Sequence, residues 1–280
     1  MSNMEYNLKI RKSSFYPKCN LNDKRNFKRI YLIQKDGTVV EKVILNVIDS
    51  FKRETIILFH YLSFMIKRFY QVKVGVNVIS RDNPWDFRVE TSENETYNIE
   101  ITSIAESKSI FKNYSSEDLY SEWCTNNEIP LHKLNKILTL FPQINQEKAT
   151  KELLKNEYHK NDFVSNQLYS ESETIFLSKI EGRFKNPKDM LIEIISKKAD
   201  KSHAQKDQTV IIIDNRTLHF ELDDFLEALP DIAKYCASLD FPEVWLYTGY
   251  CSDDDGNNSD YSFIPIKVRE NQESILNLKN

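Results

Sequence analysis

Residues 84–103 carry the sequence feature that most restricts the fold: two short segments of alternating apolar and polar residues joined by a polar turn. The segments cover residues 86–91 and 96–103, and the residues between them, Ser-Glu-Asn-Glu, are typical of turns. The pattern predicts a β-hairpin. In its second strand, Glu100 and Thr102 point to one face, opposite to the face of the neighbouring isoleucines.

Glu100 lies in the middle of this strand, where a carboxylate loses solvation unless a metal, a cation or hydrogen-bond donors compensate it. Asp86 is the candidate neighbour. A loop of three or five residues places Asp86 opposite Glu100 or Thr102, whereas a four-residue loop pairs it with Ile101 on the other face. The sequence leaves both registers open. Two carboxylates on one face, about 5 Å apart, favour a hard divalent cation; otherwise Asp86 is a turn former and Glu100 faces solvent.

Composition limits the class of protein. The chain has 280 residues, 40% of them hydrophobic, which is enough for a sizeable core. No apolar run is long enough to span a bilayer, and the first residues have no apolar signal core, so we expect no membrane partner. The four cysteines are scattered, which argues against zinc and disulfides and favours a cytoplasmic location. Five glycines exclude glycine-rich phosphate loops.

Charge is uneven along the chain. The formal net charge is -4, which argues against a surface that binds polyanions all over. Residues 1–30 nevertheless contain eight lysines and arginines against two acids, and this segment either follows a phosphate backbone or is simply solvated. We assign residues 1–45 to this basic segment and a β-hairpin that turns at Asp36-Gly37. Residues 46–280 would form the main domain.

The main domain begins with a helix over about residues 46–70, where apolar residues recur every three or four positions. Glu54 lies on or beside this apolar stripe, so it is either a buried acid or an edge residue that pairs with Lys52 or Arg53. A strand over residues 71–80 then leads into the hairpin. Residues 106–185 are polar and predict a mostly helical insertion.

After the insertion, Asn186-Pro187 and the following Asp189 predict the start of a helix that runs to about Lys201. Lys197, Lys198 and Lys201 gather in its last turn, where the helix dipole favours cations. A buried strand at 207–214, a helix at 222–239 and a strand from 243 predict a right-handed parallel crossover, followed by a last strand at 261–268. The acidic run at 253–255 lacks the spacing of a calcium loop and is expected to be a solvated turn.

This order of elements resembles the PD-(D/E)XK nuclease superfamily, the restriction-endonuclease-like fold, over residues 46–104 and 187–250. The resemblance implies an α/β fold with a mixed central sheet flanked by helices, here with a helical insertion. Pro84-Trp85-Asp86 resembles the first half of the motif with one residue inserted, and Glu100-Ile101-Thr102 resembles the second half. Thr102 stands where the family has lysine.

The family motif implies a metal-dependent endonuclease that hydrolyses DNA, of the restriction or phage-defence type. Asp86 and Glu100 would hold Mg²⁺, or Mn²⁺, with Glu54 as a further ligand and Thr102 as a supporting residue. The missing lysine would come from the neighbouring helix, as Lys201 or Lys198.

A literal Glu106-Ser107-Lys108 ranks lower as a source of the lysine, because it lies beyond the expected end of the strand. The partner implied is DNA, with a homodimer or a multi-subunit assembly.

Two other functions fit the sequence. One is a non-catalytic DNA- or protein-binding subunit on a degenerate nuclease-like scaffold, in which Asp86 and Glu100 face apart or a lysine salt bridge fills the site. The other is an unrelated α/β enzyme whose site lies at the carboxyl ends of the parallel strands, near Asp214-Asn215-Arg216 and Thr248.

Overall fold

The chain divides into two compact units, residues 1–106 with 185–280, and residues 107–184. The computed structural model describes residues 27–33, 36–45, 47, 49–69, 74–82, 84–106, 108–144, 147–155, 161–171, 184–202, 204–220, 222–251 and 259–276. Most of the basic segment predicted at 1–30 lies outside these residues, and so does the acidic turn at 253–255.

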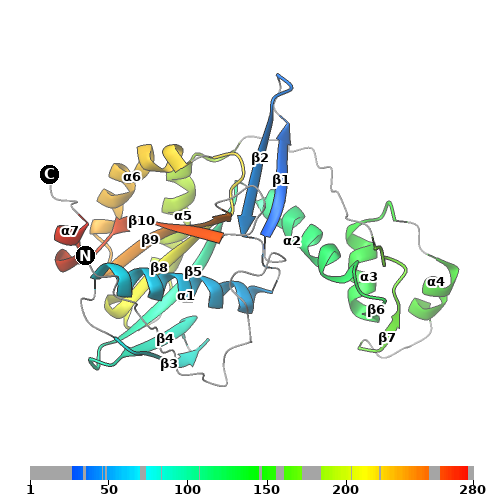
Figure 1. Ribbon diagram of the computed structural model, residues 1–280, viewed down its shortest axis with the longest axis horizontal. Helices are drawn as coiled ribbons and strands as arrows, with labels where there is room; N and C mark the ends of the chain where they lie inside the picture. The colour runs from blue at the N-terminus through cyan, green and yellow to red at the C-terminus, as the bar shows by residue number, and fades with distance from the viewer. Residues whose placement is uncertain are drawn as a thin grey trace, which may run out of the picture. The chain divides into compact units, whose positions relative to one another are not determined.

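The first unit is built on a mixed sheet flanked by helices, which confirms the predicted α/β class (Figure 1). The parallel strand β8 lies between β5 and β9, and the remaining neighbours pair antiparallel. In order across the sheet, the six central strands are β10 (Ser259–Lys267), β9 (Glu243–Cys251), β8 (Thr209–Asn215), β5 (Thr96–Ile104), β4 (Phe87–Thr91) and β3 (Val76–Arg81).

A separate hairpin extends this sheet. Its strands are β1 (Phe27–Ile33) and β2 (Val39–Leu45), and they pair antiparallel around the predicted turn at Asp36-Gly37. Gly37 has φ of +87°, a conformation that glycine adopts without a steric penalty. The hairpin joins β9 through one residue pair, Ile44 with Tyr250, so it is an edge ribbon.

Strand β8 forms because its central run, Val-Ile-Ile-Ile, is β-branched and apolar on both faces. All four of these residues are fully buried. Helix α6 (Leu222–Ala237) connects β8 to β9, and the two strands are parallel, as the alternation of strand, helix and strand predicted.

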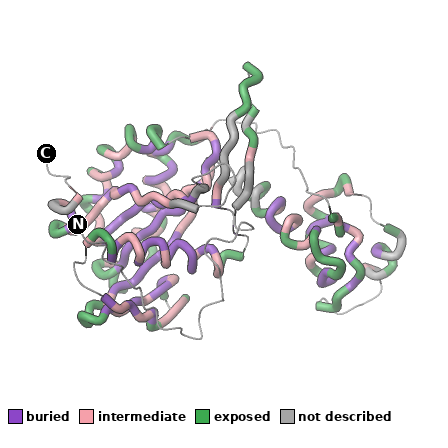
Figure 2. The backbone as a smooth tube through the Cα atoms, in the orientation of Figure 1, coloured by how far each residue is buried: buried purple, intermediate pink, exposed green. Residues whose placement is uncertain are grey.

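Helices cover both faces of the sheet. Helix α1 (Ser50–Phe69) packs on the face that carries Ile99, Ile101 and Ile212, whereas α5 (Pro187–Ala199) and α6 pack on the face that carries Ile211 and Ile213. Figure 2 shows the resulting buried sheet between partly exposed helices. A short 3-10 helix, η2 (Lys206–Gln208), precedes β8, and α7 (Glu270–Ile275) follows β10.

Helix α5 begins where the sequence predicted. The side chain of Asn186 accepts a hydrogen bond from the backbone N–H of Asp189 at 2.8 Å, and Pro187 occupies the first helical position. The helix ends at Ala199, so Lys198 lies in its last turn and Lys201 lies just beyond it. Because the helix starts at Pro187, Lys198 and Lys201 lie at its C-terminal end.

The second unit has its own apolar core, formed among others by Leu119, Ile129, Leu134 and Ile137. Its described elements are α2 (Lys108–Trp123), β6 (Glu128–Pro130), α3 (Leu131–Leu140), α4 (Lys148–Lys155) and β7 (Phe163–Ser165). Strands β6 and β7 pair antiparallel. Sequence periodicity did not reveal them, because three residues are too few to show an alternating pattern.

Among the described residues, no helix combines the length and the apolar character that crossing a bilayer requires.

Candidate metal-binding site

The register of the β4–β5 hairpin places the two acids of the predicted motif opposite each other. Five residues separate the last paired residues, Glu90 and Thr96, and the pairing continues to Phe87 with Ile99. One further step puts Asp86, the residue before β4, across from Glu100 on β5. Of the two registers that the sequence left open, the structure adopts the one in which the two carboxylates share a face.

Asp86 is held by the backbone of the neighbouring strand. Its Oδ2 accepts a hydrogen bond from the N–H of Ile101 at 2.6 Å. Burial raises the pKa of Asp86 to about 7, and repulsion by Glu100 and Glu54 adds to the shift, whereas the Ile101 hydrogen bond and Lys198 oppose it. Asp86 is therefore a carboxyl group that a nearby cation would help to ionise.

Glu100 is buried and meets two lysines from the region of α5. The ammonium group of Lys198 forms an ion pair with Glu100 Oε1, and Lys201 Nζ lies 3.2 Å from the same oxygen. The side chain of Lys198 is 14% exposed and that of Lys201 is 42% exposed. The two lysines predicted to replace the family lysine, whose position Thr102 occupies, thus both contact Glu100. Lys198 is mostly buried and Lys201 is more exposed.

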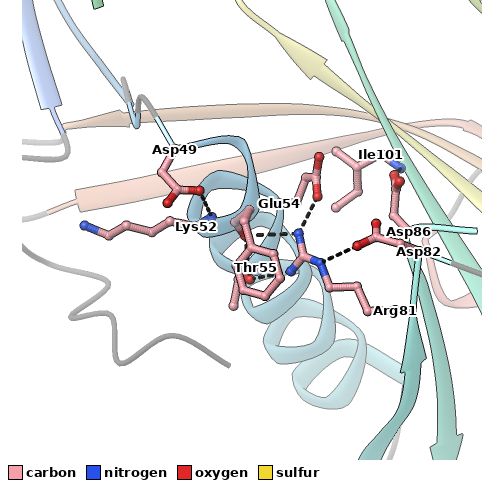
Figure 3. Close-up of polar contacts among 9 residues, drawn as sticks. Asp49, Lys52, Glu54, Thr55, Arg81, Asp82, Asp86 and Ile101 are labelled. Atoms are coloured by element: carbon pink, nitrogen blue, oxygen red, sulfur yellow. Dashed lines mark hydrogen bonds and ion pairs between the residues drawn. The ribbon is translucent and has the colours of Figure 1, made fainter. Parts of the chain in front are cut away.

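A third carboxylate reaches the same place from the opposite layer. Glu54 on α1 accepts a 2.5 Å hydrogen bond from Arg81 Nη2 at the end of β3. Burial raises the pKa of Glu54, Arg81 lowers it, and Asp82 and Glu100 raise it further. Glu54, Asp82 and Asp86 can each offer one oxygen such that the three oxygens lie within 4.8 Å of one another, which is suitable for a metal ion (Figure 3).

Sequence reasoning missed Asp82 and Arg81. Asp82 has φ of +57°, a left-handed conformation that aspartate tolerates, and it directly follows β3. The signal was present in the sequence Arg81-Asp82-Asn83-Pro84, which puts an acid four residues before Asp86. Because this acid lies in a turn, its direction depends on backbone angles that the sequence pattern does not specify.

The predicted alternative in which Glu54 pairs with Arg53 is wrong. Arg53 is buried and forms a two-point ion pair with Asp214, with Nε–Oδ2 and Nη2–Oδ1 distances of 2.6 Å each. Arg53 Nη1 also donates to the backbone oxygen of Leu45. Arg53 therefore pairs with Asp214, and Glu54 pairs with Arg81.

Thr102 lies two residues beyond Glu100 on β5 and is half-buried. The alternative acid, Glu106, is buried and its Oε1 accepts hydrogen bonds from the backbone N–H groups of Leu218 and His219. Glu106 thus anchors the segment after β8, a structural role. The side chain of Lys108 lies outside the described residues.

At the carboxyl ends of the parallel strands, the other predicted location, polar side chains are hydrogen-bonded to one another. Asp214 accepts hydrogen bonds from Arg53 through both oxygens, and Ser103 Oγ donates to Oδ2 at 3.0 Å. Asn215 Nδ2 donates to Thr248 Oγ1 at 3.3 Å. Arg53 and Asp214 form a buried ion pair, whereas Ser103, Asn215 and Thr248 are half-buried.

Comparisons with known proteins add no relative to this picture: no family model, no curated protein and no solved structure matches the chain.

Proposed function

We propose that this protein is a metal-dependent hydrolase of DNA phosphodiester bonds, built on a restriction-endonuclease-like scaffold. The order of elements supports the scaffold: α1, the antiparallel strands β3, β4 and β5, then α5 and the parallel strand β8. The acids that resemble the family motif lie on β5 and just before β4, and the lysines come from α5 and its end.

One observation carries the proposal, the convergence of four carboxylates and two lysines from separate parts of the chain. Glu54, Asp82 and Asp86 bring oxygens within 4.8 Å of one another, and Glu100 lies across from Asp86. Lys198 and Lys201 meet at Glu100. Burial raises the pKa values of Glu54 and Asp86, so the ionised forms of these two carboxylates oppose folding, and their position beside other acids supports a role in binding a ligand.

The donor set fits Mg²⁺ or Mn²⁺, which prefer carboxylate oxygen ligands. Asp86 would be the central ligand, with Glu54 and Asp82 beside it, directly or through water. Glu100, which the sequence suggested as a ligand, pairs with Lys198 and Lys201 instead. When bound, such an ion polarises a phosphodiester oxygen and lowers the pKa of a coordinated water.

The protein's own groups would orient and compensate the reacting phosphate. Ile101 N–H fixes the Asp86 carboxylate, and Glu100 holds Lys198 where an ammonium group can stabilise negative charge that develops on the phosphate. Lys201, which is more exposed, would meet the DNA backbone first.

The test is cleavage of duplex DNA, single-stranded DNA and RNA by the purified protein with Mg²⁺ or Mn²⁺. We expect duplex DNA to be cut with either ion, and Glu100→Ala or a chelator to abolish cutting. Substitution of Glu152, an exposed acid on α4, by alanine provides the matched control. If the Glu100→Ala variant still cuts DNA, this site does not carry out the reaction.

One observation favours a second candidate, a non-catalytic binding subunit on the same scaffold. Glu100 is neutralised by two lysines, which is the filled site expected of a degenerate nuclease. In that case DNA would bind equally well with and without divalent ions, no substrate would be cut, and Lys201→Ala would weaken binding.

A further inference from the structure

Arg81 lies inside the acidic cluster and is almost fully buried (Figure 3). Its side chain is 4% exposed. Nη2 contacts Glu54 Oε2 at 2.5 Å, and Nε lies 3.5 Å from Asp82 Oδ2. The guanidinium group therefore bridges two of the three carboxylates that could hold a metal ion.

Packing fixes this guanidinium in place. Its central carbon lies 3.3 Å from the ring centroid of Phe51 and 4.6 Å from that of Phe87. Nη1 donates to Thr55 Oγ1 at 3.0 Å, and Nη2 also donates to the backbone oxygen of Phe51 at 3.3 Å. A side chain held by stacking and hydrogen bonds on α1 and β4 cannot move aside easily when a metal ion arrives.

The charges of the described cluster limit how many ions it can take. Four carboxylates, Glu54, Asp82, Asp86 and Glu100, face three cations, Arg81, Lys198 and Lys201. With all groups ionised, the cluster has one net negative charge. One divalent ion changes this to one net positive charge, which would repel a second ion.

We propose that Arg81 is a permanent cation of this cluster, which takes the place of a second metal ion, so that the site binds a single divalent ion centred on Asp86. Each bridged carboxylate has two oxygens, and one can contact the arginine while the other faces the ion. Arg81 is thus a positioning residue that also sets metal stoichiometry. The inference rests on the metal site of the proposed function, although it does not require DNA cleavage.

Loss of the arginine charge should strengthen binding of cations. Without Arg81, the carboxylates of Glu54 and Asp82 have no bridging partner, and a divalent ion is the next available compensation. At these separations we expect Mn²⁺ affinity to rise about tenfold or more, or a second Mn²⁺ to bind. If Arg81 only supports the fold, its loss should instead weaken Mn²⁺ binding, because disordered ligands bind metal less well.

The experiment is a titration of the metal-free, full-length protein with Mn²⁺, in which electron paramagnetic resonance measures the concentration of free Mn²⁺. We expect one Mn²⁺ per chain for the natural sequence and none at this site for Asp86→Asn. Arg81→Met keeps the length and the apolar contact with both phenylalanine rings but removes the charge, so it should bind Mn²⁺ more tightly or take up two. Arg81→Lys keeps the charge and should bind one.

Arg68→Met is the matched control, because it makes the same change in the exposed last turn of α1. It should leave the titration unchanged. If circular dichroism shows that Arg81→Met does not fold, Arg81→Gln replaces it with the same expectation.

Two Mn²⁺ per chain in the natural protein, or an Arg81→Met protein that binds one Mn²⁺ with equal or weaker affinity, would overturn the inference. A natural protein that binds no Mn²⁺ would refute both this inference and the proposed function. One bound Mn²⁺ without cleavage of any substrate would refute the hydrolase alone.

Discussion

The burial of Asp86 in the folded protein opposes the ionised form of its carboxyl group, which metal binding requires. Its pKa of about 7 stands above the ordinary value of 3.8, because the folded protein buries the carboxyl group beside Glu100 and Glu54. The folded state therefore binds more protons than the unfolded state between about pH 4 and pH 7. Across this window, the contribution of Asp86 to stability decreases as the pH rises.

Asp86→Asn should stabilise the metal-free protein at alkaline pH. Asparagine keeps an oxygen that can accept the Ile101 hydrogen bond but cannot ionise, so the free energy of unfolding at pH 8 should rise by roughly 1–3 kcal/mol after allowance for partial exposure. Thermal melting at pH 4 and pH 8, with a chelator present, measures the difference. The two proteins should melt alike at pH 4, and a lower melting temperature of the variant at pH 8 would contradict the assignment.

Binding of a divalent ion should depend on the same proton. A metal ion competes with the proton on Asp86, so the Mn²⁺ affinity of the natural protein should increase as the pH rises through about 7 and level off above it. Titrations at pH 6, 7 and 8 measure the slope. The same affinity at all three values would show that Asp86 is not a ligand.

Lys198 and Lys197 are neighbours on α5 with different surroundings, and they offer a matched pair for the catalytic role. Lys198 pairs with the buried Glu100, whereas Lys197 is exposed and pairs with Glu193 at 2.5 Å. Lys198→Met should reduce the cleavage rate about a hundredfold or more, because one cation at the reacting phosphate is lost. Lys197→Met should cut normally, and equal rates of the two variants would place the lysine function elsewhere.

At the scale of the elements, α5 is the helix on which the lysine positions depend, and its N-cap is one identified source of its stability. Asn186→Ala removes the hydrogen bond to Asp189 N–H and should lower the free energy of unfolding by about 1 kcal/mol. Asn135→Ala in the exposed interior of α3 is the control and should not destabilise, because alanine favours helix interiors. Urea unfolding followed by circular dichroism compares them, and equal effects would refute the capping role.

Elements with a strong periodic signal were predictable. The hairpin of β4 and β5, the buried strand β8 and the capped start of α5 follow from alternation, β-branched runs and capping residues, which are local properties of the chain. The short strands β6 and β7 were not, because pairing between distant three-residue segments leaves no local pattern.

Side-chain partners were less predictable than elements. Sequence identified Asp86, Glu100, Glu54 and the lysines of α5 as candidates, but the hairpin register that decides whether Asp86 and Glu100 meet stayed open. Arg81 and Asp82 were missed, because their contacts depend on a turn between strands and on packing against Phe51. Spacing in the chain does not encode such tertiary geometry.

At the scale of the whole molecule, the site residues come from segments far apart in the chain. Residues 107–184 form a compact unit of their own. In the sequence, this unit is inserted between β5, which carries Glu100, and α5, which carries Lys198. All six proposed metal or catalytic side chains, Glu54, Asp82, Asp86, Glu100, Lys198 and Lys201, belong to the first unit. We propose that this unit alone supplies the divalent-ion site.

The most direct test of that claim is an anomalous difference map from crystals grown with Mn²⁺. We predict one peak about 2.2 Å from a carboxylate oxygen of Asp86, with Glu54 and Asp82 around it, and no peak in Asp86→Asn. A map with no peak among these acids, or with its peak at the carboxyl ends of β8 and β9, would contradict the account.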